Sequence, residues 1–323
     1  MPAETLLDIN GLTVLYKAGG GAVKAVDGIG FSVNRGEIFA LVGESGCGKS
    51  TVAASIMRLV RAPGAITGGR ILFEGRDLFK LSRREMEKTR GREIGMVFQN
   101  PLDSLNPVQR VGKQLAEAAS LDRLPKKAAW KEAVRWLKEV RIPDPEQRAR
   151  DYPFEYSGGM RQRAMIAMMS FRKPKLLIAD EPTTALDVTI QAQILRLLRE
   201  EQMRLGNSIL LITHDFGVVA ELADRVGIMY GGSIVEVGGV TDVFENPLHP
   251  YTRLLLAALP TITKHEGRLQ SIPGAVKSGP MEQFCKFYHR CPDRNERCGD
   301  GPQALIEVEP GHFSACADWG GVE

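Results

Sequence analysis

The chain has 323 residues, of which 43% are hydrophobic and 25% are charged, so it can bury one large core or two modest ones. Lys and Arg number 42 against 39 Asp and Glu, and a net charge of +3 over this length gives no concentrated field to attract nucleic acid. The N-terminus lacks the apolar stretch of a secretory signal, and no window approaches the roughly 18 apolar residues of a membrane span, which predicts a cytosolic chain without a nucleic-acid partner.

The first informative segment is a short apolar run at 38–43, followed by a glycine-rich loop and by helical spacing from Ser50 to Val60. The loop fits the phosphate-loop pattern G-x-x-x-x-G-K-S/T in its strand, loop and helix context. Backbone N–H groups of such a loop converge on phosphate oxygens, the Lys reaches the β- and γ-phosphates, and the Ser can ligate Mg²⁺. We therefore predict that ATP and Mg²⁺ bind to Gly43, Glu44, Ser45, Gly46, Cys47, Gly48, Lys49, Ser50 and Thr51, with Cys47 only a small residue tolerated between glycines.

About 130 residues separate this loop from the next strand of the same kind, too many for one crossover, which predicts an inserted segment. The stretch from Gly112 to Val140 is rich in Ala, Lys, Glu and Leu and is predicted to be helical. A further helix is predicted from Met160 to Phe171, and the N–H groups at its start can also bind phosphate.

Two later apolar runs, 176–179 and 209–213, are predicted strands that end in polar residues. The first ends in Asp180 and Glu181, and the second in His214. Adjacent strand residues point to opposite faces, so Asp180 can hold Mg²⁺ while Glu181 polarises the attacking water. Beyond them, residues 225–238 are predicted to form a hairpin that turns at Gly231 and Gly232.

The segment from Ser157 to Arg163, Ser-Gly-Gly-Met-Arg-Gln-Arg, resembles the signature motif of the ABC transporter ATPases. Gln99, Asp180 with Glu181, the segment 185–187 and His214 follow the order of that family's other motifs. The resemblance implies an α/β P-loop NTPase with a RecA-like core, an antiparallel β subdomain and an inserted α-helical subdomain at about 101–172, all within an ATPase domain of residues 1–247. Tyr156 and Met160 depart from the family's usual Leu and Gln, and neither departure removes a phosphate ligand.

The same resemblance assigns roles to single residues. Gln99 would contact Mg²⁺ and the attacking water, Glu181 would act as the base, and His214 would bond the γ-phosphate. Tyr16 would stack on adenine, although a lone Tyr is as often a packing residue. Two such domains pair head to tail in the family, so the ATP held by one loop would be closed over by the partner's Ser157, Gly158, Gly159 and Asp187.

The C-terminal part from residue 248 to 323 is a loop-rich, cysteine-containing extension whose opening, 246–255, resembles that of dipeptide and oligopeptide transporter ATPases. Four of the five cysteines lie there, at Cys285, Cys291, Cys298 and Cys316. Four thiolates suffice for a 4Fe–4S cluster or a tetrahedral zinc. The absence of paired C-x-x-C knuckles favours iron–sulfur over zinc, and unliganded or disulfide-linked cysteines remain a third interpretation.

The resemblance implies the motor of an importer for di- and oligopeptides, on the cytoplasmic face of the inner membrane. Its partners would be a second ATPase subunit, as a heterodimer with a paralogue, two transmembrane permease subunits and a periplasmic or extracellular solute-binding protein. Related motors serve nickel, opines, oligosaccharides and glutathione, which stay open as alternatives. A non-transport ABC ATPase acting on nucleic acid or ribosomes is disfavoured because the chain has no second ATPase domain and no basic linker.

Overall fold

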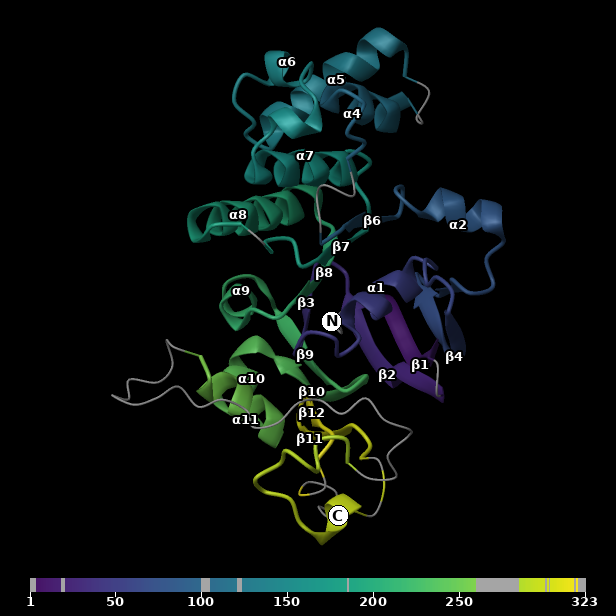
Figure 1. Ribbon diagram of the computed structural model, residues 1–323, viewed down its shortest axis with the longest axis vertical. Coiled ribbons are helices and arrows are strands. Elements are labelled where there is room, and N and C mark those ends of the chain that lie inside the picture. Colours follow the sequence, from purple (N-terminus) through teal and green to yellow (C-terminus); the bar gives the residue numbers. More distant parts are fainter. Residues whose placement is uncertain are drawn as a thin grey trace. The chain divides into compact units, whose positions relative to one another are not determined.

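The computed structural model describes residues 4–18, 21–99, 105–120, 124–184, 186–259, 285–299, 301, 303–316 and 318 (Figure 1). The chain forms two compact units. The first unit joins residues 1–80 to residues 212–323, and the second comprises residues 81–211.

An antiparallel sheet of the first unit has the strand order β2-β1-β4-β5. The strands are β1 (Thr5–Ala18), β2 (Gly21–Asn34), β4 (Gly64–Phe73) and β5 (Arg76–Asp77). Side chains alternate between the two faces of a regular strand, so Ile9 and Leu12, three residues apart, would point to opposite faces. A bulge between these residues, with Gly11 at φ 62°, keeps both apolar side chains buried.

The other strands of the first unit begin with β3 (Ile38–Val42), which pairs in parallel with β9 (Arg225–Tyr230). β9 and β10 (Ser233–Gly239) form the expected hairpin, and its turn residues Gly231 and Gly232 have φ 52° and 82°. Positive φ at both central residues is what a two-residue hairpin turn requires. β12 (His312–Ser314) and β11 (Ile306–Glu309) then extend β10, so the C-terminal extension contributes strands to this sheet.

The helices of the first unit are α1 (Lys49–Ile56), α9 (Phe216–Leu222), α10 (Val240–Glu245) and α11 (Pro250–Ala257), with a 3₁₀ turn at Glu296–Gly299. α1 is shorter than the predicted helix that ran to Val60, because Arg58 has φ 49° and cannot continue it. In the part of the chain that the structure describes, no helix is long and apolar enough to cross a bilayer.

The second unit contains the parallel strands β6 (Ile94–Val97) and β7 (Leu176–Asp180), and β8 (Ser208–Thr213), which neighbours β7, begins in this unit and ends in the first. Its helices are α2 (Arg83–Thr89), α4 (Val111–Ser120), α5 (Lys126–Glu139), α6 (Pro145–Arg148), α7 (Gly158–Ser170) and α8 (Val188–Leu205), with a 3₁₀ turn at Pro153–Glu155. α4 and α5 confirm the helices predicted at 112–140. Residues 101–104, where the helical subdomain was predicted to begin, lie outside the described residues.

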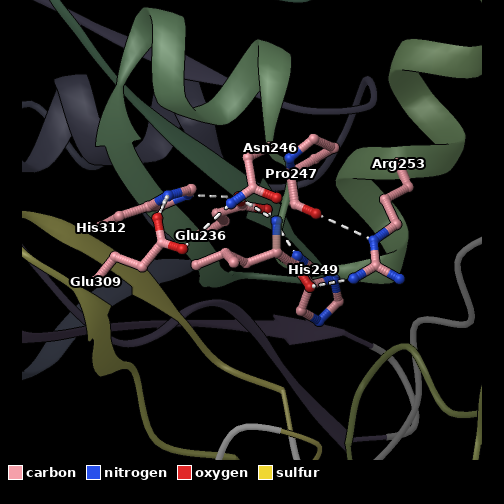
Figure 2. Close-up of polar contacts among 8 residues, drawn as sticks. Glu236, Asn246, Pro247, His249, Arg253, Glu309 and His312 are labelled. Atoms are coloured by element: carbon pink, nitrogen blue, oxygen red, sulfur yellow. Dashed lines mark hydrogen bonds and ion pairs between the residues drawn. The ribbon is translucent and has the colours of Figure 1, made fainter.

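A buried carboxylate joins the C-terminal strands to the rest of the first unit (Figure 2). Glu236 of β10 is fully buried and accepts hydrogen bonds from the backbone N–H groups of Leu248 and His249, at 2.8 and 2.9 Å. Nε2 of His312 lies 2.8 Å from the same carboxylate. One side chain therefore ties β10, β12 and the entry to α11 together.

His249 caps α11, because its Nδ1 accepts a hydrogen bond from the N–H of Tyr251 at 3.0 Å. Burial lowers the pKa of His249 to about 4, Glu236 opposes this shift, and Arg253 adds to it. The His249 imidazole is therefore harder to protonate in the folded state than in the unfolded chain. The stability of the folded state falls as the pH drops from about 6.5 towards 4. Between pH 7 and pH 5 we expect the free energy of unfolding to fall by about 2 kcal/mol through this residue alone.

The check is thermal or urea unfolding across this pH range for the native chain and for His249→Asn, which keeps a capping side chain without the titration. The variant should show a shallower loss of stability below pH 6.5. Equal pH slopes for the two proteins would contradict this account of His249.

Candidate functional site

The predicted phosphate loop lies in the first unit, between β3 and α1. Lys49 is buried, and its ammonium group donates to the carbonyl oxygens of Gly43 and Glu44, at 2.7 and 3.0 Å. Ser45, Gly46 and Ser50 are exposed, and no side chain caps the start of α1. The loop therefore presents a helix N-terminus, a lysine and a hydroxyl, which together suit a phosphate with its Mg²⁺.

Close backbone contacts fix the shape of this loop. Gly48 has φ 110°, and a Cβ there would lie 2.2 Å from the carbonyl oxygen of Ala25. The N–H of Gly232, in the β9–β10 turn, donates to the carbonyl oxygen of Cys47 at 3.0 Å. Cys47 itself is buried, and burial raises the pKa of its thiol, which agrees with a packing role.

Two further predicted residues lie in the first unit. His214 is exposed directly after β8, whose residues are all buried. Tyr16 is half-buried in β1, and a Cβ on Gly64 would lie 2.6 Å from its ring, so the ring packs closely over that glycine. This contact gives Tyr16 a packing role in the sheet.

The second unit brings Gln99 and Glu181 together, as their positions after two parallel strands would suggest. Nε2 of Gln99 and the hydroxyl of Thr184 each donate to Oε2 of Glu181 at 2.8 Å. Glu181 has φ 46°, in a region that side chains other than glycine rarely adopt. Asp180 ends β7 almost completely buried, and its oxygens are of the type that Mg²⁺ prefers.

The signature segment also lies in the second unit, at the start of α7. Ser157 caps the helix by accepting from the N–H of Met160 at 3.3 Å, which is why α7 begins two residues earlier than predicted. Ser157 and Gly158 are exposed, whereas a Cβ on Gly159 would lie 2.7 Å from Ile190. This helix N-terminus therefore has an exposed serine and glycine at its tip.

Other residues of this region have structural contacts that the sequence did not indicate. Tyr156 is buried and donates to the carbonyl oxygen of Arg148 at 2.9 Å. Arg161 donates to the carbonyl oxygen of Pro153, and Arg163 to that of Val140. Asp187 caps α8 by accepting from the N–H of Ile190 at 2.9 Å, while Ala185 lies outside the described residues.

The four C-terminal cysteines lie within the first unit, and none of them forms a disulfide bond in the part of the chain that the structure describes. Burial raises the pKa of Cys291 and Cys316 to about 11, and nearby Cys285 and Cys298 contribute to both shifts. Among the residues described, however, no group of three or more His, Cys, Asp or Glu side chains is arranged to hold a metal ion. The sequence-based expectation of a metal centre is therefore not supported by this arrangement.

Two residues at the phosphate loop escaped the sequence analysis. Arg290 forms an ion pair with Glu44, and the hydroxyl of Tyr251 accepts a hydrogen bond from the N–H of Glu44 at 3.2 Å. Tyr251 lies in the segment 246–255, for which the sequence indicated a resemblance to peptide transporter ATPases but no role for any single residue. The resemblance of this segment was the one sequence feature that could have drawn attention to Tyr251. Nothing in the sequence distinguished Arg290 from other arginines.

The fold and the phosphate loop define an ABC-type ATP-binding protein. The family model described as "ABC transporter" matches residues 26–184, and that described as "Oligopeptide/dipeptide transporter, C-terminal region" matches residues 235–298. A dimeric post-hydrolysis structure of the ATP-binding cassette MJ0796 with ADP and Pi has a TM-score of 0.65 at 26% identity, covering 72% of this chain and 98% of that one. Clostridium perfringens cbiO1, part of the transporter complex cbiONQ, also has a TM-score of 0.65, at 31% identity, with 75% and 92% covered.

Relatives of known sequence are more similar still. A probable peptide ABC transporter ATP-binding protein of Sinorhizobium fredii, y4tR, is 49% identical over 97% of this chain and 95% of its own length. The oligopeptide transport ATP-binding protein OppD of Bacillus subtilis is 53% identical over 83% and 76%, and the dipeptide transport protein DppD of the same species is 48% identical over 91% and 89%. The chain belongs to the family of oligopeptide and dipeptide ABC transporter ATP-binding proteins, and it is an ATPase of that family.

Proposed function

We propose that this chain is the ATP-hydrolysing motor subunit of an importer for di- and oligopeptides. The observation that carries this proposal is the similarity to peptide-transport relatives over nearly the whole chain, including the C-terminal region outside the ATPase core. Related motors serve other solutes, so nickel, opines, oligosaccharides and glutathione are the alternatives to test. We also propose the domain division given by the sequence, with an ATPase domain at 1–247 and an extension at 248–323.

In this proposal the residues of each unit supply one part of the chemistry. The phosphate loop with Lys49 would bind the phosphates, and Ser50, Gln99 and Asp180 would supply oxygen ligands for Mg²⁺, whose charge would offset that of the phosphates. Glu181 accepts a proton from the attacking water, with Gln99 and His214 positioning water and γ-phosphate. The hydrogen bond between Gln99 and Glu181 supports this assignment, because it joins the residue proposed to contact Mg²⁺ and the attacking water to the proposed base.

A second ATPase subunit completes the site, through its own Ser157, Gly158, Gly159 and Asp187 or their counterparts in a paralogue. Two transmembrane permease subunits and an external solute-binding protein complete the transporter, which places this chain on the cytoplasmic face of the cell membrane. Adenine stacking by Tyr16 is compatible with its half-buried ring at the sheet.

The test is to purify the chain from membranes with its partners and to survey ligands of the associated solute-binding protein. We expect hydrophobic permease subunits to co-purify and di- or oligopeptides to bind. Selective binding of nickel, an opine, an oligosaccharide or glutathione would contradict the peptide assignment, and co-purification with ribosomes or nucleic acid would contradict transport.

We further propose that Cys285, Cys291, Cys298 and Cys316 ligate a 4Fe–4S cluster. Four thiols supply the right donor chemistry, and Cys285 and Cys298 lie close enough to Cys291 and Cys316 to add to the rise that burial causes in the pKa of those two. A cluster of eight atoms also needs its ligands further apart than a single zinc ion does, so it does not require the compact group that the described residues lack. The side chains would still have to converge on the cluster.

Iron, sulfide and zinc analysis of anaerobically purified protein, with its visible spectrum, tests this proposal. We expect about four iron and four sulfide per chain, lost in Cys291→Ser and kept in Cys47→Ser. A colourless, iron-free preparation would contradict the cluster, and a bound zinc would replace it.

A further inference from the structure

The segment from Cys285 to Cys291 reaches the phosphate loop through one arginine. Both terminal nitrogens of Arg290 donate to the Glu44 carboxylate, at 2.8 and 3.0 Å. The Arg290 side chain is 7% exposed and that of Glu44 is 29% exposed. A bidentate pair this well shielded holds its geometry better than an ion pair on an open surface.

Tyr251 holds the same loop residue by its backbone. Its hydroxyl accepts the N–H of Glu44, and its buried ring lies edge-on to Tyr230 and at a tilt to Phe287. Burial raises the pKa of Tyr251, so the hydroxyl stays neutral at physiological pH. Backbone and side chain of Glu44 are thus both held by the C-terminal extension.

The segment that carries Arg290 is itself firmly packed. Phe287 is 1% exposed, and Lys286 donates to the carbonyl oxygen of Gly231 at 2.9 Å while pairing with Asp27 at 2.9 Å. The neighbouring Gly232 bonds the phosphate loop at Cys47. The extension and the phosphate loop therefore share one support, the β9–β10 turn, which helps to fix the position of the Arg290 guanidinium beside the loop.

We propose that Arg290 is a positioning residue for nucleotide binding, which holds the Glu44 carboxylate and neutralises its charge at the phosphate loop. The inference rests on the proposed role of this loop as the ATP site. A carboxylate beside the loop repels a triphosphate, and the repulsion is strong where protein shields the charges from water. The Glu44–Arg290 pair has no net charge, so the electrostatic potential at the phosphate site is set by the N–H groups of the loop and by Lys49. Arg290 acts through Glu44 and is not a catalytic residue.

The sign of the charge effect gives a test with three variants, read out as the dissociation constant for ATP and as KM and kcat of hydrolysis. Arg290→Met leaves the negative charge of the Glu44 carboxylate without its partner and should weaken ATP binding about tenfold. The effect should appear as a higher KM, with little change in kcat. Glu44→Gln leaves an unpaired cation and should strengthen binding about threefold. The double variant should bind ATP more tightly than Arg290→Met alone.

Arg294→Met is the matched control, since Arg294 is an exposed cation four residues after Arg290 whose guanidinium lies 5.7 Å from the centroid of the Tyr288 ring. It should leave ATP affinity unchanged, and circular dichroism checks that all variants fold. Equal weakening by Arg290→Met and Glu44→Gln, without recovery in the double variant, would overturn the charge-positioning role, as would unchanged affinity of Arg290→Met. The native chain tests the proposed function separately: if it does not bind ATP, the proposed function is wrong, whatever the variants show.

Discussion

Replacing Glu181 with Gln is expected to slow ATP hydrolysis about 100-fold or more while ATP binding persists. The carboxylate follows β7 and accepts hydrogen bonds from Gln99 and Thr184, so it is held in place at the end of the strand. Glutamine has nearly the same shape and can accept the same bonds, but it cannot take a proton from water. The loss should therefore fall on the chemical step, in kcat.

The measurement is steady-state hydrolysis together with nucleotide-dependent dimerisation, because a subunit that binds ATP without cleaving it should accumulate in the closed, paired state. Glu132→Gln is the control, since Glu132 forms an ion pair with Arg135 of the same helix, α5, and has no part in the proposed site. It should leave hydrolysis unaltered. Native rates in Glu181→Gln would exclude Glu181 as the base.

The second large effect is expected at Gly48. A methyl group there would lie 2.2 Å from the Ala25 carbonyl oxygen and 2.8 Å from the Met229 side chain, and φ of 110° is strained for any other residue. Gly48→Ala should therefore shift the phosphate loop, weaken ATP binding about 100-fold or more, and lower the free energy of unfolding by about 2 to 4 kcal/mol.

Gly75→Ala separates the clash from backbone strain. Gly75 has φ 75°, in the turn between β4 and β5, and a Cβ there meets nothing within 4 Å. Its substitution should cost only the strain, about 1 kcal/mol, with ATP affinity retained. Calorimetric titration with ATP and urea unfolding measure both quantities, and equal effects at the two glycines would show that the close contact at Gly48 does not control the loop.

Local pattern was enough to predict the elements that carry the phosphate loop and the strand-end residues. β3 is apolar throughout, β7 and β8 each contain a run of four apolar residues, and all residues of the three strands are buried. The meeting of Gln99 with Glu181 follows from the rule that parallel strands end at one edge. Ser157 and Asp187 illustrate what remained hidden, since each also caps a helix in the structure.

The support of the phosphate loop could not be predicted, because its contacts are distant in sequence. Tyr251 lies 207 residues from Glu44, and Arg290 lies 246 residues from it. Periodicity and spacing report on neighbours along the chain, whereas these contacts form only when the C-terminal extension packs against the phosphate loop. The cysteines raise the same difficulty, because four thiols can be counted in a sequence but their spatial arrangement cannot.

The most direct test of the central claim is ATP hydrolysis by the complete transporter reconstituted in lipid vesicles, measured with and without its solute-binding protein and a peptide mixture. We expect hydrolysis to rise when the peptide-loaded binding protein is present, and peptide to accumulate across the membrane, with both effects lost in Glu181→Gln. A hydrolysis rate that does not change with peptide but rises with nickel, a sugar or nucleic acid would contradict the claim that this chain powers peptide import.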